Sequence, residues 1–232
     1  MIDLAGFGEQ LLLGAAVTVQ LALAALMVGL VLGLAGAVAR LSGVRAARAL
    51  AATYTTVVRG LPELLVVLII YFGSSRLLTA IGESLGHDGF VELSPFAAGV
   101  VALGLTFGAY ATEIFRGAIL AIPKGQIEAA HAFGMGRVLT FRRIVLPQLW
   151  RIALPGLGNL FLVLLKDTSL VSVIGLEELM RKAQIATGFT REPFTFYLAA
   201  ATLYLLMTIV AMAVLHRAER AAGRGLPQVR GR

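Results

Sequence analysis

Long apolar stretches, separated by short polar intervals, dominate this chain. Uncharged runs long enough to cross a bilayer, which takes about 20 residues, occur at 10–39, 93–112 and 193–216. Two further apolar segments are interrupted by charge, LLVVLIIYFG (64–73) and IALPGLGNLFLVLL (152–165). We therefore expect an all-α membrane protein, one domain over residues 1–232, with transmembrane helices near 12–38, 57–80, 94–117, 148–170 and 193–216.

Composition supports lipid as the solvent of most of this surface. Hydrophobic residues make up 58% of the chain and charged residues 14%, whereas soluble domains carry roughly 25% charged residues. The uncharged run 10–39 is too long for the apolar core of a signal peptide, so we expect a retained span. There are no cysteines, and His87, His131 and His216 are scattered, so we expect no metal site.

The positive charges predict the orientation of the helices. Fifteen of the 20 Lys and Arg residues fall in the segments 40–59, 116–151 and 217–232, and five fall in 1–9, 76–92 and 166–192. Basic residues are retained in cytoplasmic loops. We therefore expect the N-terminus outside and the C-terminus inside. Because the positive charges follow the loops and form no single face, nucleic acid is not an expected partner.

The cytoplasmic loop 118–147 contains a polar interval, EAAHAFGMGRVLTFRRIVLP (128–147). Glu128 stands in the first turn of a short predicted helix, where a carboxylate complements the helix dipole. Glycines 134 and 136 are suited to its end. Ile127, Ala130 and His131 share one helical face. These residues alone leave open two interpretations, a helix that docks on another protein or an interfacial loop that links two spans.

The interval also carries a recognisable pattern: E-A-A, three residues, G, nine residues, then I-x-L-P. The matching residues are Glu128, Ala129, Ala130, Gly134, Ile144, Leu146 and Pro147. This pattern resembles the cytoplasmic loop signature of permease subunits of binding-protein-dependent ABC importers. The resemblance implies that the interval, His131 included, is the coupling helix that contacts a separate ATPase.

Three other elements resemble those of polar-amino-acid permeases. They are Arg59-Gly60-Leu61-Pro62-Glu63, Gly108-Ala109-Tyr110 with Glu113-Ile114-Phe115-Arg116-Gly117, and Lys166-Asp167-Thr168-Ser169-Leu170. Within that family the chain is most similar to the first membrane subunit of histidine/lysine/arginine/ornithine importers and of opine importers. The resemblance implies a type I importer transmembrane domain that forms half of the pathway for a basic amino acid or an opine. A permease for glutamine or glutamate is the alternative.

The resemblance also implies the partners. They are an ATP-binding subunit dimer, a second permease subunit, identical or similar, an extracytoplasmic solute-binding protein and the lipid bilayer of the bacterial inner membrane. ATP and Mg²⁺ would be held by the ATPase and no cofactor by this chain. A P-loop needs lysine after a glycine-rich turn, and Lys124, Lys166 and Lys182 follow Pro, Leu and Arg.

Two acidic residues next to apolar segments are candidates for the substrate pathway. A charge inside a span costs about 2.5–3.5 kcal/mol on insertion scales and usually lines a cavity or an interface. We expect Asp167, with Thr168 and Ser169, to line the passage of a cationic substrate, and Glu63 to contribute. The alternative is that Asp167 pairs with a Lys or Arg of a neighbouring helix or lies at the outer water interface.

Other polar residues have structural interpretations. Glu113 and Arg116 are spaced for an i,i+3 pair, and Arg59 and Trp150 suit an inner interface. An intramembrane enzyme would need a nucleophile with a base or a cluster of acids, and Ser74 and Ser75 have no histidine close in sequence. A secondary carrier often contains inverted repeats, which five unlike spans do not provide. A structural subunit without a passage of its own stays open.

Overall fold

In the computed structural model, which describes residues 6–84 and 92–223, every regular element is a helix. The π-helical segment η1 and the 3₁₀ segment η2 continue neighbouring α-helices. In chain order the elements are α1 (Gly8–Leu41), α2 (Arg45–Gly60), α3 (Glu63–Ser84), α4 (Pro95–Leu120), α5 (Lys124–Ala132), α6 (Arg137–Thr140), η1 (Phe141–Val145), α7 (Leu146–Asp167), η2 (Thr168–Ile174), α8 (Leu179–Thr190) and α9 (Pro193–Ala222).

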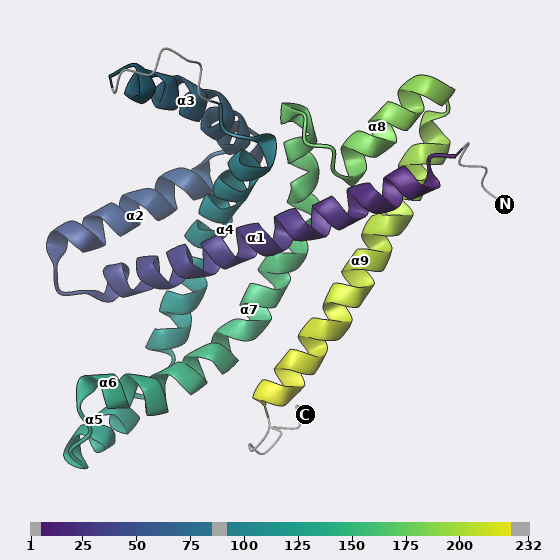
Figure 1. Ribbon diagram of the computed structural model, residues 1–232. Helices are drawn as coiled ribbons and strands as arrows, with labels where there is room; N and C mark the ends of the chain where they lie inside the picture. Colours follow the sequence, from purple (N-terminus) through teal and green to yellow (C-terminus); the bar gives the residue numbers. More distant parts are fainter. Residues whose placement is uncertain (1–5, 85–91, 224–232) are drawn as a thin grey trace.

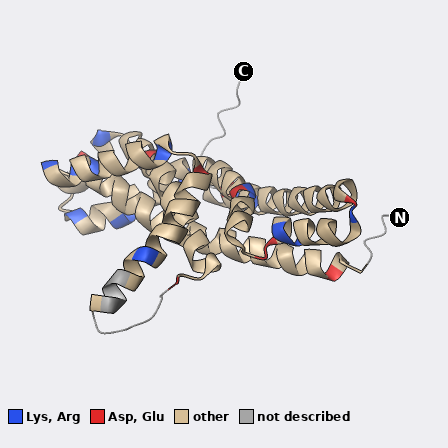
Figure 2. Cartoon of the chain, turned by 90° about the horizontal axis from the view of Figure 1, so that it is seen from above, with Lys and Arg blue, Asp and Glu red and all other residues tan. Residues whose placement is uncertain are grey.

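The helices run between two ends of the molecule (Figure 1). The short helices α5 and α6 and the end of α9 lie at one end, and α8 with the start of α1 lies at the other. Most Lys and Arg residues lie toward the side of the molecule away from the N-terminus (Figure 2). His87 and the basic tail that follows Gly223 lie outside the described residues.

The helices agree with four of the expected spans, and with the fifth if the bent pair α2–α3 counts as one span. Four helices of the described residues are long and apolar enough to cross a membrane, and two of the expected helices, the second and the fourth, differ from the structure in their bounds. The expected helix over 57–80 is wrong in its first part, because α2 ends at Gly60 and α3 begins at Glu63 with a 110° bend between them. Pro62 causes this break, since it lacks an N–H and forces Leu61 into an extended conformation (ψ 143°).

The expected fourth helix, 148–170, is part of a longer one. Helical backbone is continuous over Arg137–Ile174, 38 residues. Its π-turn, η1, ends at Val145, two residues before Pro147. A proline inside a helix removes one backbone hydrogen bond and crowds the preceding turn, and a local π-turn is one way in which a helix accommodates such a change. The segment that enters the membrane at Pro147 is therefore one piece with the polar interval before it.

The central packing contact of the fold joins α1 to α4. Glycines of α1 face α4 so closely that an added Cβ would have no room. At Gly29 it would lie 2.6 Å from a Phe107 ring carbon, and at Gly33 it would lie 2.6 Å from the Ala111 Cβ. Small residues of this kind let helix backbones approach closely in a membrane, where lipid tails remove the hydrophobic drive between helices.

A second contact joins α1, α8 and α9 through one fully buried carboxylate, Glu178. It caps α8 by accepting a hydrogen bond from the Arg181 N–H (2.8 Å). The hydroxyls of Thr18 in α1 (3.3 Å) and Tyr204 in α9 (3.0 Å) donate to its other oxygen. Burial raises the pKa of the Glu178 carboxyl, and the hydrogen bonds that it accepts oppose that rise.

The α1–α4 contact predicts different results for the same substitution at two glycines. Gly33→Ala overpacks the contact between α1 and α4, which lowers the unfolding free energy by roughly 1–3 kcal/mol. The melting temperature in detergent should therefore fall. Gly117→Ala, in α4 with nothing within 4 Å of the added Cβ, should leave it unchanged or raise it, because alanine is the better helix former. Equal melting temperatures for the two variants would contradict a tight contact between α1 and α4.

The hydrogen bonds of Glu178 predict different stabilities for two substitutions at this position. Glu178→Ala removes the acceptor of the hydrogen bonds from the Arg181 N–H and the Tyr204 hydroxyl and one of the two acceptors of the Thr18 hydroxyl, which also donates to the Gly14 carbonyl oxygen (3.1 Å). This change should cost roughly 2–4 kcal/mol of unfolding free energy. Glu178→Gln keeps an acceptor and a similar shape, so most of the stability should remain.

The pH dependence of unfolding adds a second readout. Since the folded-state pKa of Glu178 is raised, its ionisation costs stability as the pH rises above the ordinary glutamate value of about 4.3. The glutamine variant should lose that part of the slope. A glutamine variant with the wild-type slope would show that another group causes it.

Candidate functional site

Glu63 and Asp167 meet in one pocket. Glu63 is the first residue of α3, immediately after the break at Pro62, and Asp167 is the last residue of α7, where the helix tightens into the 3₁₀ turn η2. The pocket has a volume of about 260 Å³. Its walls come from α3, α4 and α7, and the remaining lining residues are Leu103, Thr106, Phe107, Tyr110, Leu160, Val163 and Leu164.

Neither carboxylate of this pocket forms an ion pair within residues 6–84 and 92–223. Both side chains are half-buried, and among the ion pairs of the described residues none involves Glu63 or Asp167. The alternative that Asp167 pairs with a Lys or Arg of a neighbouring helix therefore has no support within the described residues. Two carboxylates that share one largely apolar pocket repel each other and attract a cation.

The other two residues expected beside Asp167 do not line this pocket. Thr168 is fully buried, and its hydroxyl donates to the Leu165 carbonyl oxygen (2.8 Å). The Ser169 hydroxyl donates to the Lys166 carbonyl oxygen (2.8 Å). Both hydroxyls are thus engaged with the backbone of the helix that ends there.

A second cavity, of about 380 Å³, shares Tyr110, Leu160 and Val163 with the first. It is also lined by Arg59, Glu113, Ile114, Gly156 and Asn159. The Arg59 guanidinium lies 5.1 Å from the centroid of the Tyr110 ring, a distance typical of a cation–π interaction. Arg59 was expected only as an interface anchor, and its position on the wall of a cavity is a finding of the structure.

Glu113 is held by two arginines. Arg116 approaches it to 2.7 Å, which confirms the expected i,i+3 pair, and Arg40 of α1 approaches it to 3.5 Å. The second partner is 73 positions away in the chain and had no local signal in the sequence.

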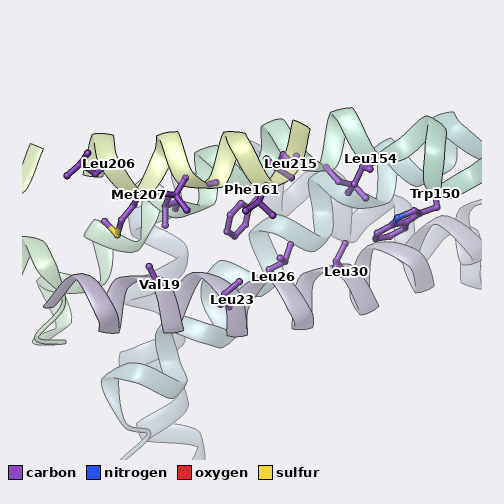
Figure 3. Close-up of a pocket in the computed structure, with 16 residues that line it drawn as sticks. Val19, Leu23, Leu26, Leu30, Trp150, Leu154, Phe161, Leu206, Met207 and Leu215 are labelled. Carbon is purple, nitrogen blue, oxygen red and sulfur yellow. The ribbon is translucent and has the colours of Figure 1, made fainter. Parts of the chain in front are cut away.

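A third cavity, larger than these two, is a different surface. It is a groove of about 650 Å³ between α1, α7 and α9, and its lining side chains are apolar apart from the indole N–H of Trp150. Figure 3 shows Leu23, Leu26 and Leu30 along one side of the groove and Phe161, Leu154 and Trp150 of α7 along the other. A groove of this composition suits lipid tails, whereas the two cavities with charged lining residues lie along α4 and α7.

The polar interval contains the expected short helix, α5, but the placement of Glu128 in its first turn is wrong, because α5 begins four residues earlier, at Lys124. The helix ends in a Schellman motif: the Met135 N–H donates to the Ala130 carbonyl oxygen (3.0 Å) and the Gly134 N–H to the His131 carbonyl oxygen (2.9 Å). Gly134 has a φ of 75°, a left-handed conformation that glycine adopts without steric cost. The requirement for glycine at this position is thus a matter of backbone geometry.

Burial divides the residues of α5 into two faces. Ala130 is 5% exposed and Ile127 packs against the core, so this face of the helix points into the chain. Glu128, Ala129 and His131 are exposed. Phe133, which the sequence interpretation did not single out, is 88% exposed, an unusual position for a large apolar side chain at a polar end of the molecule.

A glutamine pair ties α5 to the membrane-entering helix. The Gln148 side-chain amide of α7 donates to the Gln126 side-chain oxygen of α5 (2.7 Å) and to the Ile144 carbonyl oxygen (2.8 Å). Leu146 and Pro147 are exposed and Ile144 is half-buried. The direct contact between α5 and α7 is thus made by Gln148, the residue that follows Pro147 of the matched pattern.

No group of three or more His, Cys, Asp or Glu side chains in residues 6–84 and 92–223 is arranged to hold a metal ion. The described part of the molecule thus offers two adjoining polar cavities on one side, an apolar groove on the other and an exposed helix at one end.

Comparison with known proteins agrees with this arrangement. The family described as "Binding-protein-dependent transport system inner membrane component" matches residues 25–224. The octopine transport system permease protein OccQ of Rhizobium meliloti is 50% identical over 221 residues, 95% of this chain and 93% of the relative. The histidine/lysine/arginine/ornithine transport system permease protein HisQ of Salmonella typhimurium is 45% identical over 215 residues, 93% of this chain and 94% of the relative.

Solved structures give the same result for the fold. A chain described as an amino acid ABC transporter with histidines has a TM-score of 0.79 and 32% identity, covering 95% of this chain and 99% of that one. An inward-facing chain of the MetNI methionine transporter has a TM-score of 0.74 at 18% identity, over 94% of this chain and 98% of that one, and supports the fold alone. The chain therefore belongs to the family of binding-protein-dependent transport system inner membrane components and is a multi-pass permease subunit.

Proposed function

We propose that this permease forms half of the translocation pathway for a basic amino acid or an opine in a bacterial inner membrane. The observation that carries the proposal is the pocket in which Glu63 and Asp167 meet without an ion-pair partner from the described residues. An ammonium, guanidinium or imidazolium group would supply the missing charge. Relatives named for octopine, for histidine, lysine, arginine and ornithine, and for arginine support the same class of substrate.

The chemistry of the pocket separates this proposal from its alternatives. A glutamate side chain would bring a third negative charge beside Glu63 and Asp167, and a glutamine side chain would leave both uncompensated. Hydrolytic chemistry finds no support in the serines named above, because the Ser74 and Ser75 hydroxyls donate to the Tyr71 carbonyl oxygen (3.1 Å each).

A second permease subunit would complete the pathway. Arg59 and Asn159 are exposed along the second cavity, and charged groups within a membrane face a water-filled cavity or a protein partner. The polar side of α4 and α7 is therefore the side that would face the second subunit. The apolar groove between α1, α7 and α9 would face lipid.

An ATPase would supply the energy at the α5 end of the molecule. Basic residues surround this end, which favours a cytoplasmic location with the N-terminus outside and the C-terminus inside. ATP and Mg²⁺ would be bound by that partner. The exposed face of α5, with Ala129 and Phe133, is the contact surface that we propose, and an extracytoplasmic binding protein would deliver substrate at the opposite end.

Loss of either acidic charge should weaken uptake. Asp167→Asn and Glu63→Gln each remove one charge-assisted interaction with the substrate cation, so KM for arginine uptake should rise roughly tenfold or more. Uptake would be measured in vesicles with the complete importer and its binding protein. ATPase activity stimulated by the binding protein reports whether the variants still assemble.

Glu9→Gln, which neutralises an exposed acid in the first turn of α1, is the matched control and should leave KM unchanged. Unchanged uptake of arginine, lysine and histidine in both pocket variants would refute the proposed substrate site.

Docking through α5 predicts a contrast between two neighbouring alanines. Because the chain has no cysteine, Ala129→Cys and Ala130→Cys each introduce a single thiol. In the intact complex, a short bifunctional reagent should crosslink the exposed position 129 to the ATPase and leave the buried position 130 unreacted. Crosslinking at neither position, with the complex shown to be intact by gel filtration, would count against α5 as the docking helix.

A further inference from the structure

The two adjoining cavities carry opposite charges. The first contains the carboxylates of Glu63 and Asp167, and the second contains the guanidinium of Arg59. Tyr110, Leu160 and Val163 line both, so the cavities lie side by side along α4 and α7. The pair is therefore a bipolar site with an acidic end and a basic end.

The charge of Arg59 is not neutralised within the described residues. Glu113 shares its cavity but is held between Arg116 (2.7 Å) and Arg40 (3.5 Å). No ion pair or hydrogen bond of the described chain involves the Arg59 side chain, whose one recorded partner is the Tyr110 ring. A guanidinium that rests on an aromatic ring still has N–H groups along its edges, and these match the two oxygens of a carboxylate.

The break at Pro62 places the two charges on the same surface. Arg59 lies in the last turn of α2, and Glu63 opens α3 four residues later, across a bend of 110°. One side chain thus reaches the second cavity while the other reaches the first. An arginine that served only as an anchor at the membrane interface would have no reason to line a cavity beside a pair of unpaired carboxylates.

We infer that Arg59 binds the α-carboxylate of the transported amino acid while Glu63 and Asp167 hold its side-chain cation. This assignment rests on the proposed function, since it takes the acidic pocket as the place of the cation. Tyr110 positions Arg59 by supporting one face of the guanidinium and forms part of the wall between the two ends of the site. A free amino acid satisfies both ends, whereas an amine without a carboxylate satisfies one.

The inference predicts selection against decarboxylated substrates by the permease itself. Arginine and agmatine both carry a guanidinium and an amine, and they differ by the carboxylate. The permease should bind arginine roughly 10- to 100-fold more tightly than agmatine, the range expected for one charge-assisted hydrogen-bonded pair. Arg59→Gln should bring this ratio close to one by weakening arginine binding with little change for agmatine.

The experiment uses the complex of both permease subunits with the ATPase, in lipid nanodiscs and without the binding protein, which would impose its own selectivity. Radiolabelled arginine is displaced by unlabelled arginine or agmatine in the wild type, Arg59→Gln and Arg59→Lys. Arg59→Lys retains the charge but loses the planar fork, so it should recover part of the discrimination. Arg45→Gln, an exposed arginine of the same helix, is the matched control and should keep the wild-type ratio.

The outcomes separate this inference from the proposed function. If the wild type binds arginine and agmatine equally, or if Arg59→Gln weakens both by the same factor, the assignment of the carboxylate to Arg59 is overturned and the acidic pocket stands. If arginine binding is unaffected by Asp167→Asn and Glu63→Gln in the same assay, the proposed cation site itself fails. A collapsed ratio in Arg59→Gln alone supports the bipolar site.

Discussion

The close approach of α1 and α4 is the contact on which the rest of the permease depends. Glycines 29 and 33 bring the two backbones together, and α4 in turn supplies Tyr110 to both polar cavities. In lipid the hydrophobic effect contributes little to helix association, because lipid tails are as apolar as the side chains. Close van der Waals packing between small residues provides the association instead. With α4 fixed in the middle of the chain, α3 and α7 can carry acidic groups beside it without forming the structural core themselves.

Much of this arrangement follows from the sequence, and the exceptions have physical reasons. Apolar run lengths predicted the spans, and the two acids next to broken runs do share a pocket. Helix α2 was missed because small and polar residues at positions 45–60 make no apolar run. Periodicity placed Ile127 and Ala130 on one face of α5, but only tertiary packing decides that this face points inward. The partners of Glu178 lie in helices distant in sequence and leave no local pattern.

The described surface has an apolar side, which suits lipid, and a side with charged cavities, which suits water or a protein partner. The groove between α1, α7 and α9 offers lipid no polar group beyond one indole, while the opposite side carries unpaired acidic and basic groups. Helical backbone runs without interruption from Arg137 to Ile174. Asp167 therefore belongs to the same continuous helix as Gln148, which contacts α5. The end of this helix near α5 and the end that carries Asp167 are thus parts of one continuous element, so a displacement of one end is passed to the other.

The bend between α2 and α3 has a consequence for affinity. Arg59 and Glu63 stand on opposite arms of a hinge whose link is Leu61 and Pro62. Rotation of one arm against the other changes the separation of the two side chains, whereas the separation of the charges within a bound zwitterion is limited by covalent geometry. The angle between α2 and α3 and the affinity for the ligand are therefore linked. A ligand whose charges match one separation of Arg59 and Glu63 favours the angle that gives this separation. A forced change of that angle lowers the affinity for the same ligand.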